Sequence, residues 1–233
     1  MKKETIIIIT LPILCAVAAI LAYVKLINTD VDSVKFKNEY EGLNEAGIEL
    51  NIDKNNPIEY ADYDKILEII ENGTGIIYLG FPGCPWCRNA LPVLFDVAKE
   101  NNIETIYYMN ILNERDSYVV EDGKLVYAKD EEGNEKKGTE GYHKLLKALD
   151  KHLSDYTILF EEKEYKTGEK RIYAPSVIFV RDGEVLGIHV STVDSQESPK
   201  EPLTDKQYDE LYGIYEDYIL KVKGGTCSIG TFC

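Results

Sequence analysis

The chain has 233 residues, 44% of them apolar, which is enough for one compact domain with a substantial core or for two small ones. Its 26 Lys and Arg residues stand against 41 Asp and Glu residues, so the formal net charge is −15. A surface this acidic repels phosphate backbones and anionic headgroups, which argues against nucleic-acid binding.

The amino terminus is apolar over Thr5 to Ile27, with Lys25 as its only charged residue. About 20 apolar residues suffice for a helix to cross the hydrocarbon core of a bilayer. Lysines precede this stretch and aspartates follow it, so the positive-inside rule predicts that the chain starts in the cytoplasm. The alternative is a cleaved signal peptide, because Ala16–Ala18 would suit a peptidase. The apolar run continues past that point, which favours an uncleaved transmembrane anchor over residues 1–29.

In either case the rest of the chain is exported, and we expect a single-pass protein of the cell membrane whose folded part is extracytoplasmic. Disulfides persist in that compartment. Four of the five cysteines form two close pairs, Cys84/Cys87 and Cys227/Cys233. The fifth, Cys15, is interpreted as an apolar residue of the anchor helix.

Residues 30–57 are polar and broken by glycine and proline, and we interpret them as a stalk and an irregular lead-in, with a short strand at 48–52. A domain over 58–222 follows. Its first elements are expected to be a helix capped by Asp62, a strand, a helix and a strand, at 63–71, 75–81, 85–99 and 103–109. This order predicts a parallel strand pair with a crossover helix, so Cys84 and Cys87 should lie between a strand end and a helix start.

The segment from about 111 to 157 is less regular, and we interpret it as an insertion. A partner-binding cap and extra packing around the core are both compatible with its size. The elements expected next are a hairpin at 118–127 turned at Asp122-Gly123, a helix at 142–153, and strands at 157–160 and within 171–190. A final helix at 205–222, capped by Thr204, and a tail at 223–233 follow.

The motif "CPWC" at 84–87 carries the chemistry. A thiol reacts as its thiolate, and the unpaired N–H groups and dipole at a helix start favour an anion. Cys84, at the cap, is the predicted nucleophile, and Cys87, one turn further in, is predicted to attack the mixed disulfide and release the product. Pro85 suits a first helical turn because its missing N–H would have no partner there.

Two other interpretations of the pair are weaker. A structural disulfide across a two-residue loop restrains the unfolded chain very little. Half a zinc site would need two further ligands. Cys227 and Cys233 are loosely spaced and follow the last helix, and the histidines at positions 143, 152 and 189 show no ligand-like spacing. We therefore expect redox chemistry with no metal and no cofactor.

A second motif, Ala174-Pro175-Ser176, precedes an apolar strand that turns at Asp182-Gly183. Together with the strand, Cys-x-x-Cys, helix and strand before it and the helix after it, this order resembles the thioredoxin-like superfamily, over about 60–110 and 157–222. The anchor narrows the resemblance to membrane-anchored thioredoxin-like proteins of Gram-positive bacteria, some of which are called bacteriocin transport accessory proteins. The implied fold is α/β, a central mixed sheet flanked by helices, with an amino-terminal transmembrane helix and an insertion between the central strands.

The resemblance also implies roles for single residues. Pro175 would be cis and face the cysteine pair, and the backbone of Ala174 would bind the substrate beside the disulfide as a short added strand. Trp86 matches the aromatic residue that glutaredoxin-type motifs place before the second cysteine, and is expected at the substrate. Tyr78 stands where thioredoxin keeps a buried aspartate, so the proton acceptor for Cys87 is missing or comes from elsewhere.

We therefore expect a membrane-anchored, extracytoplasmic thiol–disulfide oxidoreductase. Its partners would be thiols or disulfides of exported proteins or peptides, and a redox partner that the sequence does not identify. Whether it oxidises, reduces or isomerises is left open. The alternative is a non-catalytic binding module that assists peptide or bacteriocin export on the same fold. Cys227 and Cys233 are expected to form a secondary disulfide that fastens the tail, or else a second dithiol that exchanges with Cys84.

Overall fold

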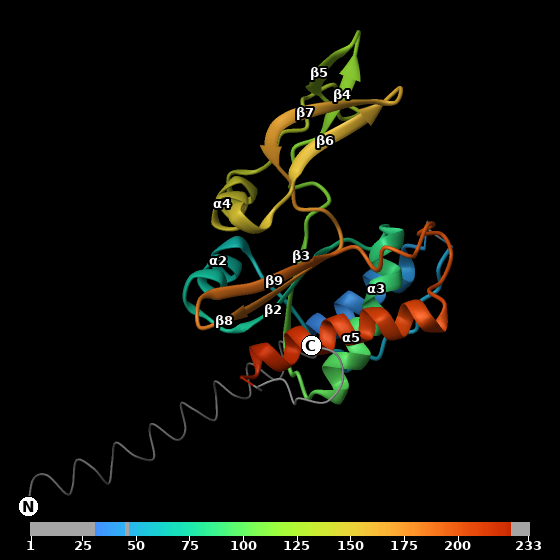
Figure 1. The fold of residues 1–233 in the computed structure, drawn as a ribbon, viewed down its shortest axis with the longest axis vertical. Coiled ribbons are helices and arrows are strands. Elements are labelled where there is room, and N and C mark those ends of the chain that lie inside the picture. Colours follow the sequence, from blue (N-terminus) through green and yellow to red (C-terminus); the bar gives the residue numbers. More distant parts are fainter. Residues whose placement is uncertain (1–30, 45–46, 225–233) are drawn as a thin grey trace, which may run out of the picture.

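The computed structural model describes residues 31–44 and 47–224 (Figure 1). The expected transmembrane helix within 1–29 and the cysteines at 227 and 233 lie outside the described residues. Within 31–44 and 47–224, no helix combines the length and the apolar character needed to cross a membrane.

A five-stranded mixed sheet with helices on both faces forms the body of the protein (Figure 1). The strand order is β1-β3-β2-β8-β9; β1 and β2 run parallel to β3, whereas β8 runs antiparallel to both β2 and β9. The elements of this body are, in chain order, β1 (Ile58–Tyr60), α2 (Tyr63–Asn72), β2 (Gly75–Gly80), α3 (Pro85–Glu100), β3 (Ile106–Asn110), α4 (Glu140–Ala148), β8 (Ser176–Arg181), β9 (Glu184–Val190) and α5 (Asp205–Val222). The predicted α/β class with a central mixed sheet is confirmed.

The central strand β2 is buried on both faces, which explains its almost continuous apolar sequence. Successive side chains of a strand point to opposite faces. Ile76 and Tyr78 therefore join the hydrophobic cluster under α3 and α5, while Ile77 and Leu79 join the cluster under α2 and α4. The dithiol lies on the side of α3 and α5.

Local sequence signals set where the helices begin. The side chains of Asp62 and Thr204 accept hydrogen bonds from backbone N–H groups of α2 and α5, as the sequence predicted. At Thr204 the capping box is complete, because Gln207 bonds back to the cap residue.

The lead-in differs from the prediction. Residues 31–42 are helical, and Phe36 and Tyr40 of this amino-terminal helix are fully buried in the cluster under α3 and α5. Arg88 of α3 is also buried, and its guanidinium donates hydrogen bonds to four carbonyl oxygens, those of Tyr40, Leu43, Ile48 and Pro82. The chain after the helix is thus fixed by a cation in the core, and the strand expected at 48–52 does not form.

Between β3 and β8 the chain leaves the sheet and forms two hairpins and α4, and the hairpins project from one end of the molecule (Figure 1). The remaining elements of this excursion are β4 (Tyr118–Glu121), β5 (Lys124–Tyr127), a short 3₁₀ helix η1 (Asp150–His152), β6 (Asp155–Phe160) and β7 (Lys163–Lys170). The β4–β5 hairpin turns at Asp122-Gly123, where both residues have positive φ, as predicted.

The insertion is longer than the sequence indicated. The strand expected at 157–160 is part of β6, but it pairs with β7 in a separate sheet and not with the central strands. The apolar strand expected after Ala174-Pro175 is β8, which begins at Ser176 and pairs with the central strand β2. The sequence of β7, KEYKTGEK, gave no strand signal because an exposed two-stranded ribbon has no buried face to require apolar residues.

Replacing Arg88 with methionine is expected to lower the free energy of unfolding by about 3 kcal/mol, because buried carbonyl oxygens lose a charged donor. Arg181→Met is the matched control, since Arg181 is exposed at the end of β8, and we expect a change within about 0.5 kcal/mol. Urea unfolding, monitored by the fluorescence of Trp86, measures the free energy of unfolding of both variants. Equal stabilities of the two variants would show that Arg88 does not hold the lead-in.

Candidate functional site

The two thiols of the CPWC motif lie where β2 gives way to α3. Cys84 has extended backbone angles, φ −77° and ψ 117°, and is the cap residue of α3, while Pro85 is the first residue of the helix. The backbone N–H of Cys87 donates to Sγ of Cys84 at 3.3 Å. Cys84 is 4% exposed and Cys87 is fully buried, and both are free thiols in this structure.

The two thiols have opposite electrostatic environments. Hydrogen bonding from the Cys87 side chain lowers the pKa of Cys84, and the backbone N–H groups of Cys87 and Trp86 and the charge of Arg115 lower it further, against the opposing effect of burial. Burial raises the pKa of Cys87 well above its ordinary value, and the neighbouring Cys84 adds to the rise. Cys84 is therefore the thiol that ionises first, and only a thiolate is a strong nucleophile.

The Ala174-Pro175 segment lies against this pair, although 90 residues separate it from Cys84 in the chain. The thiol of Cys84 donates to the carbonyl oxygen of Ala174 at 3.4 Å. The Ala174–Pro175 peptide bond is cis, as the resemblance implies. Trp86 is half-buried and packs on the same hydrophobic cluster as the cysteines.

Tyr78 of β2 reaches the second cysteine. A Cβ on Gly80 would lie 2.6 Å from the Tyr78 hydroxyl oxygen and 3.0 Å from Sγ of Cys87, so both groups fold over this glycine. Hydrogen bonding from Tyr78 lowers the pKa of Cys87, against burial. The hydroxyl of Tyr40 lies 3.2 Å from that of Tyr78. Burial raises the pKa of Tyr78 well above its ordinary value, so it is a neutral donor to a Cys87 thiolate and not a base.

Arg115 is a site residue that the sequence did not suggest. It lies on the chain that follows β3, and its guanidinium carbon is 5.3 Å from the centre of the Phe81 ring, just before the motif. Its charge is one of the causes that lower the pKa of Cys84. A lone arginine in the run NERDS carries no spacing signal, and only the fold brings it to the cysteines.

The imidazole Nε2 atoms of two histidines in the described part bond elsewhere: that of His143 lies 2.7 Å from Asp116, and that of His189 lies 2.7 Å from the carbonyl oxygen of Thr192. Over residues 31–44 and 47–224, no cluster of three or more His, Cys, Asp or Glu side chains is arranged to hold a metal ion.

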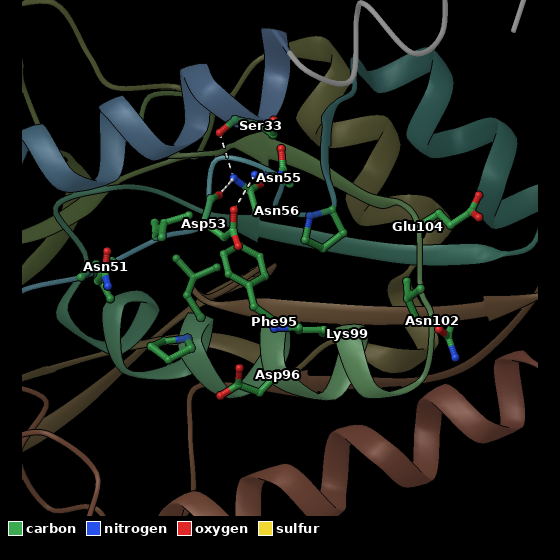
Figure 2. Close-up of a pocket in the computed structure, with 16 residues that line it drawn as sticks. Ser33, Asn51, Asp53, Asn55, Asn56, Phe95, Asp96, Lys99, Asn102 and Glu104 are labelled. Carbon is green, nitrogen blue, oxygen red and sulfur yellow. Dashed lines mark hydrogen bonds between the residues drawn. The ribbon is translucent and has the colours of Figure 1, made fainter.

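A hollow of about 720 Å³ lies between the lead-in and the outer side of α3 (Figure 2). Leu91 and Phe95 contribute apolar wall, while Asp53, Asp96 and Lys99 are among its polar lining. The cysteines and the Ala174-Pro175 segment do not line it, so this hollow is separate from the dithiol.

Comparison of the chain with protein-family models, with curated proteins and with solved structures finds no match. The function is therefore argued from the geometry of the site.

The reduced protein should show two distinct thiols. We expect Cys84 to be alkylated by iodoacetamide with an apparent pKa below that of free cysteine, and Cys87 to remain unreactive until much higher pH, because helix N–H groups and Arg115 favour the first thiolate and burial disfavours the second. Mass spectrometry of peptides from a pH series measures this. Two thiols that both titrate like free cysteine would contradict the electrostatic description.

Replacing Tyr78 with phenylalanine removes the hydroxyl beside Cys87 and is expected to slow attack by Cys87 about tenfold, because a hydrogen bond to an anionic sulfur is lost. Single-turnover reaction with oxidised glutathione, followed by the fluorescence of Trp86, separates the Cys84 step from the Cys87 step. Tyr215→Phe is the control: its hydroxyl is also buried in this cluster and has no hydrogen-bond partner among the described residues. An equal effect of both variants would remove any special role for Tyr78.

Proposed function

We propose that this protein is a thiol–disulfide oxidoreductase with a thioredoxin-like fold, in which Cys84 is the nucleophile and Cys87 the resolving thiol. The observation that carries the proposal is the geometry of the pair: Cys84 caps α3 with its Sγ bonded by the Cys87 N–H and facing the Ala174 carbonyl, while Cys87 is fully buried one turn further in. The opposite directions of the two pKa shifts agree with this geometry. A structural disulfide has no use for that difference, whereas exchange chemistry requires one ready thiolate and one protected thiol.

The order of the sheet supports the thioredoxin-like assignment. Parallel strands β1, β3 and β2 adjoin the antiparallel pair β8 and β9, with helices on both faces. The dithiol follows β2, and the cis-proline segment leads directly into β8, the neighbour of β2. The insertion interrupts this arrangement between β3 and β8.

The reaction would run in two exchanges. The Cys84 thiolate attacks one sulfur of a client disulfide, so that a mixed disulfide forms and the second client sulfur leaves as a thiolate. Cys87 then loses its proton and attacks Sγ of Cys84, forming the Cys84–Cys87 disulfide and releasing the first client sulfur, which takes up a proton. The client gains two electrons and the dithiol loses them; the reverse sequence oxidises a client, and the reduction potential sets the direction.

The client's backbone would pair with Ala174, whose carbonyl lies against Cys84 before any client arrives. Trp86, half-buried beside the pair, would contact the client as well. The proposed clients are exported proteins or peptides, because the proposed anchor at 1–29 places the domain outside the cell membrane.

One observation favours a second candidate, a non-catalytic binding module that assists peptide export. The β6–β7 hairpin exposes two large apolar side chains, Leu159 at 75% and Phe160 at 41%. Neighbouring exposed apolar residues on a projecting hairpin are typical of a contact surface. A catalytic dithiol and a contact surface are compatible, so activity decides between the two candidates.

Reduction of insulin by the protein with dithiothreitol is the discriminating measurement. We expect Cys84→Ser to lose at least about a hundredfold in rate, because the nucleophile is removed. Oxidation of a reduced client should depend on Cys84 in the same way. Absence of cysteine-dependent activity in both directions would favour the binding module.

The double variant Cys227→Ser/Cys233→Ser is the matched control for lost thiols. The described chain ends next to α5, where Lys223 donates to the carbonyl oxygen of Asn101 at the end of α3 farthest from Cys84. We therefore expect this variant to keep its turnover. A large loss would instead support a relay between the tail and Cys84.

A further inference from the structure

Arg115 is a partly buried cation for which the described residues, 31–44 and 47–224, provide no hydrogen-bond acceptor. Its Nε atom is buried and bonds to no acceptor among the described residues. Its guanidinium lies over Phe81, three residues before Cys84. Buried polar groups in native proteins are nearly always paired, so an unsatisfied cation at the edge of a reactive site calls for a partner from outside.

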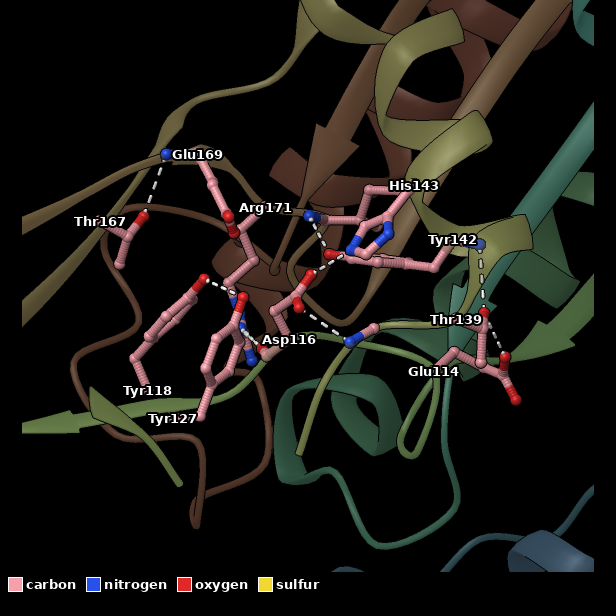
Figure 3. A network of polar contacts seen from close by, with 12 residues as sticks. Glu114, Asp116, Tyr118, Tyr127, Thr139, Tyr142, His143, Thr167, Glu169 and Arg171 are labelled. Atoms are coloured by element: carbon pink, nitrogen blue, oxygen red, sulfur yellow. Dashed lines mark hydrogen bonds and ion pairs between the residues drawn. The ribbon is translucent and has the colours of Figure 1, made fainter. Parts of the chain in front are cut away.

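The neighbouring carboxylates in the chain do not supply that partner. Glu114 accepts hydrogen bonds from the hydroxyls of Thr139, at 2.9 Å, and Tyr63, at 3.1 Å. Asp116 is bound by the backbone N–H of Gly138 at 2.8 Å and lies 2.7 Å from Nε2 of His143. Figure 3 shows Glu114 and Asp116 held in this network. Among the acidic residues that the structure describes, none pairs with the Arg115 guanidinium at the Phe81 ring.

The charge of a second guanidinium, that of Arg171, reaches Arg115 and contributes to lowering the pKa of Arg115. Arg171 lies 4.1 Å from the centre of the Tyr156 ring and 5.8 Å from that of Tyr173, the residue before Ala174. Its Nη1 donates to the backbone carbonyl of Asp116 at 2.6 Å (Figure 3). Burial and the nearby charge of Arg171 both lower the pKa of Arg115, which nevertheless stays protonated because arginine does so throughout the physiological range.

We propose that Arg115, assisted by Arg171, binds a carboxylate of the client close to the client's reacting cysteine, so that the site selects disulfides flanked by Asp or Glu. This inference rests on the proposed function. Arg115 lies against the Phe81 ring just before the motif, and Arg171 lies near the Tyr173 ring, next to Ala174, whose carbonyl contacts Cys84. A client strand paired with Ala174 would run past this part of the chain. A guanidinium matches a carboxylate in a planar, two-bonded geometry, and such pairs strengthen where water is excluded.

The charge of Arg115 also favours the Cys84 thiolate, and this second effect is separable. A cation that acts only on the thiolate changes the rate with every client by the same factor. A cation that binds a client carboxylate changes the ratio of rates between clients. The ratio is therefore the quantity to measure.

The experiment uses the full-length chain in non-ionic detergent at about 0.15 M salt, where charges more than about 8 Å apart are screened. The substrates are disulfide-linked peptides that are identical except for Glu, Gln or Lys placed two residues before or two residues after the cysteine. We expect kcat/KM to be about tenfold higher for Glu than for Gln in one of the two positions, and lowest for Lys, as one charged hydrogen-bonded pair provides.

In Arg115→Gln the ratio of Glu to Gln should fall to near one, and Arg115→Lys should restore part of it. Arg181→Gln removes the same charge at the far end of β8 and should leave the ratio unchanged. Equal rates for all peptides with the native chain would overturn the inference and leave the proposed function intact. An equal fall for all peptides in Arg115→Gln would also overturn it, assigning Arg115 to the thiolate alone.

Binding of unreactive peptides keeps the test independent of turnover. Fluorescence anisotropy of the same peptides with serine in place of cysteine should show an Arg115-dependent preference for Glu, even if no peptide is reduced. Loss of turnover with this preference retained counts against the proposed function only. Binding without any preference for Glu counts against the inference.

Discussion

One turn of helix separates Cys84 from Cys87, and this single constraint gives the two sulfurs their different chemistry. At the cap position, a hydrogen bond from the Cys87 side chain and the backbone N–H groups of Cys87 and Trp86 lower the pKa of Cys84, while burial in the core raises the pKa of Cys87. The rest of the fold preserves that asymmetry. The end of β2 fixes where α3 begins, and Gly80 leaves room for the sulfur of Cys87 and the hydroxyl of Tyr78.

The two ends of the insertion lie at the motif: one contacts Phe81 and the other contacts Cys84. The chain leaves β3 and brings Arg115 over Phe81, and it returns through Arg171 and Tyr173 to the carbonyl of Ala174. Under the proposed function, a segment anchored at these two points would shape what reaches Cys84. The hairpins project beyond it, with exposed apolar side chains available for contact with a partner.

The amino-terminal helix, residues 31–42, contacts the residues around Cys87. Its Tyr40 hydroxyl lies against that of Tyr78, which in turn lies at Cys87. Arg88 lies in the first turns of α3 and fixes the backbone that follows the amino-terminal helix. Removing this guanidinium would leave four carbonyl oxygens without a charged donor, which is costly, so the lead-in is integral to the fold.

The sequence by itself determined the central strands, the helix caps and the place of the cysteine pair, because buried strands need apolar runs and helix starts need capping side chains. It did not reveal β7, which has no fully buried residue, or the helix at 31–42, whose burial depends on partners far away in the chain. The resemblance placed Tyr78 near Cys87, but only the tertiary structure brought Arg115 to the Phe81 ring beside the motif. Contacts of that kind come from strand order and chain reversal, which leave no local period in the sequence.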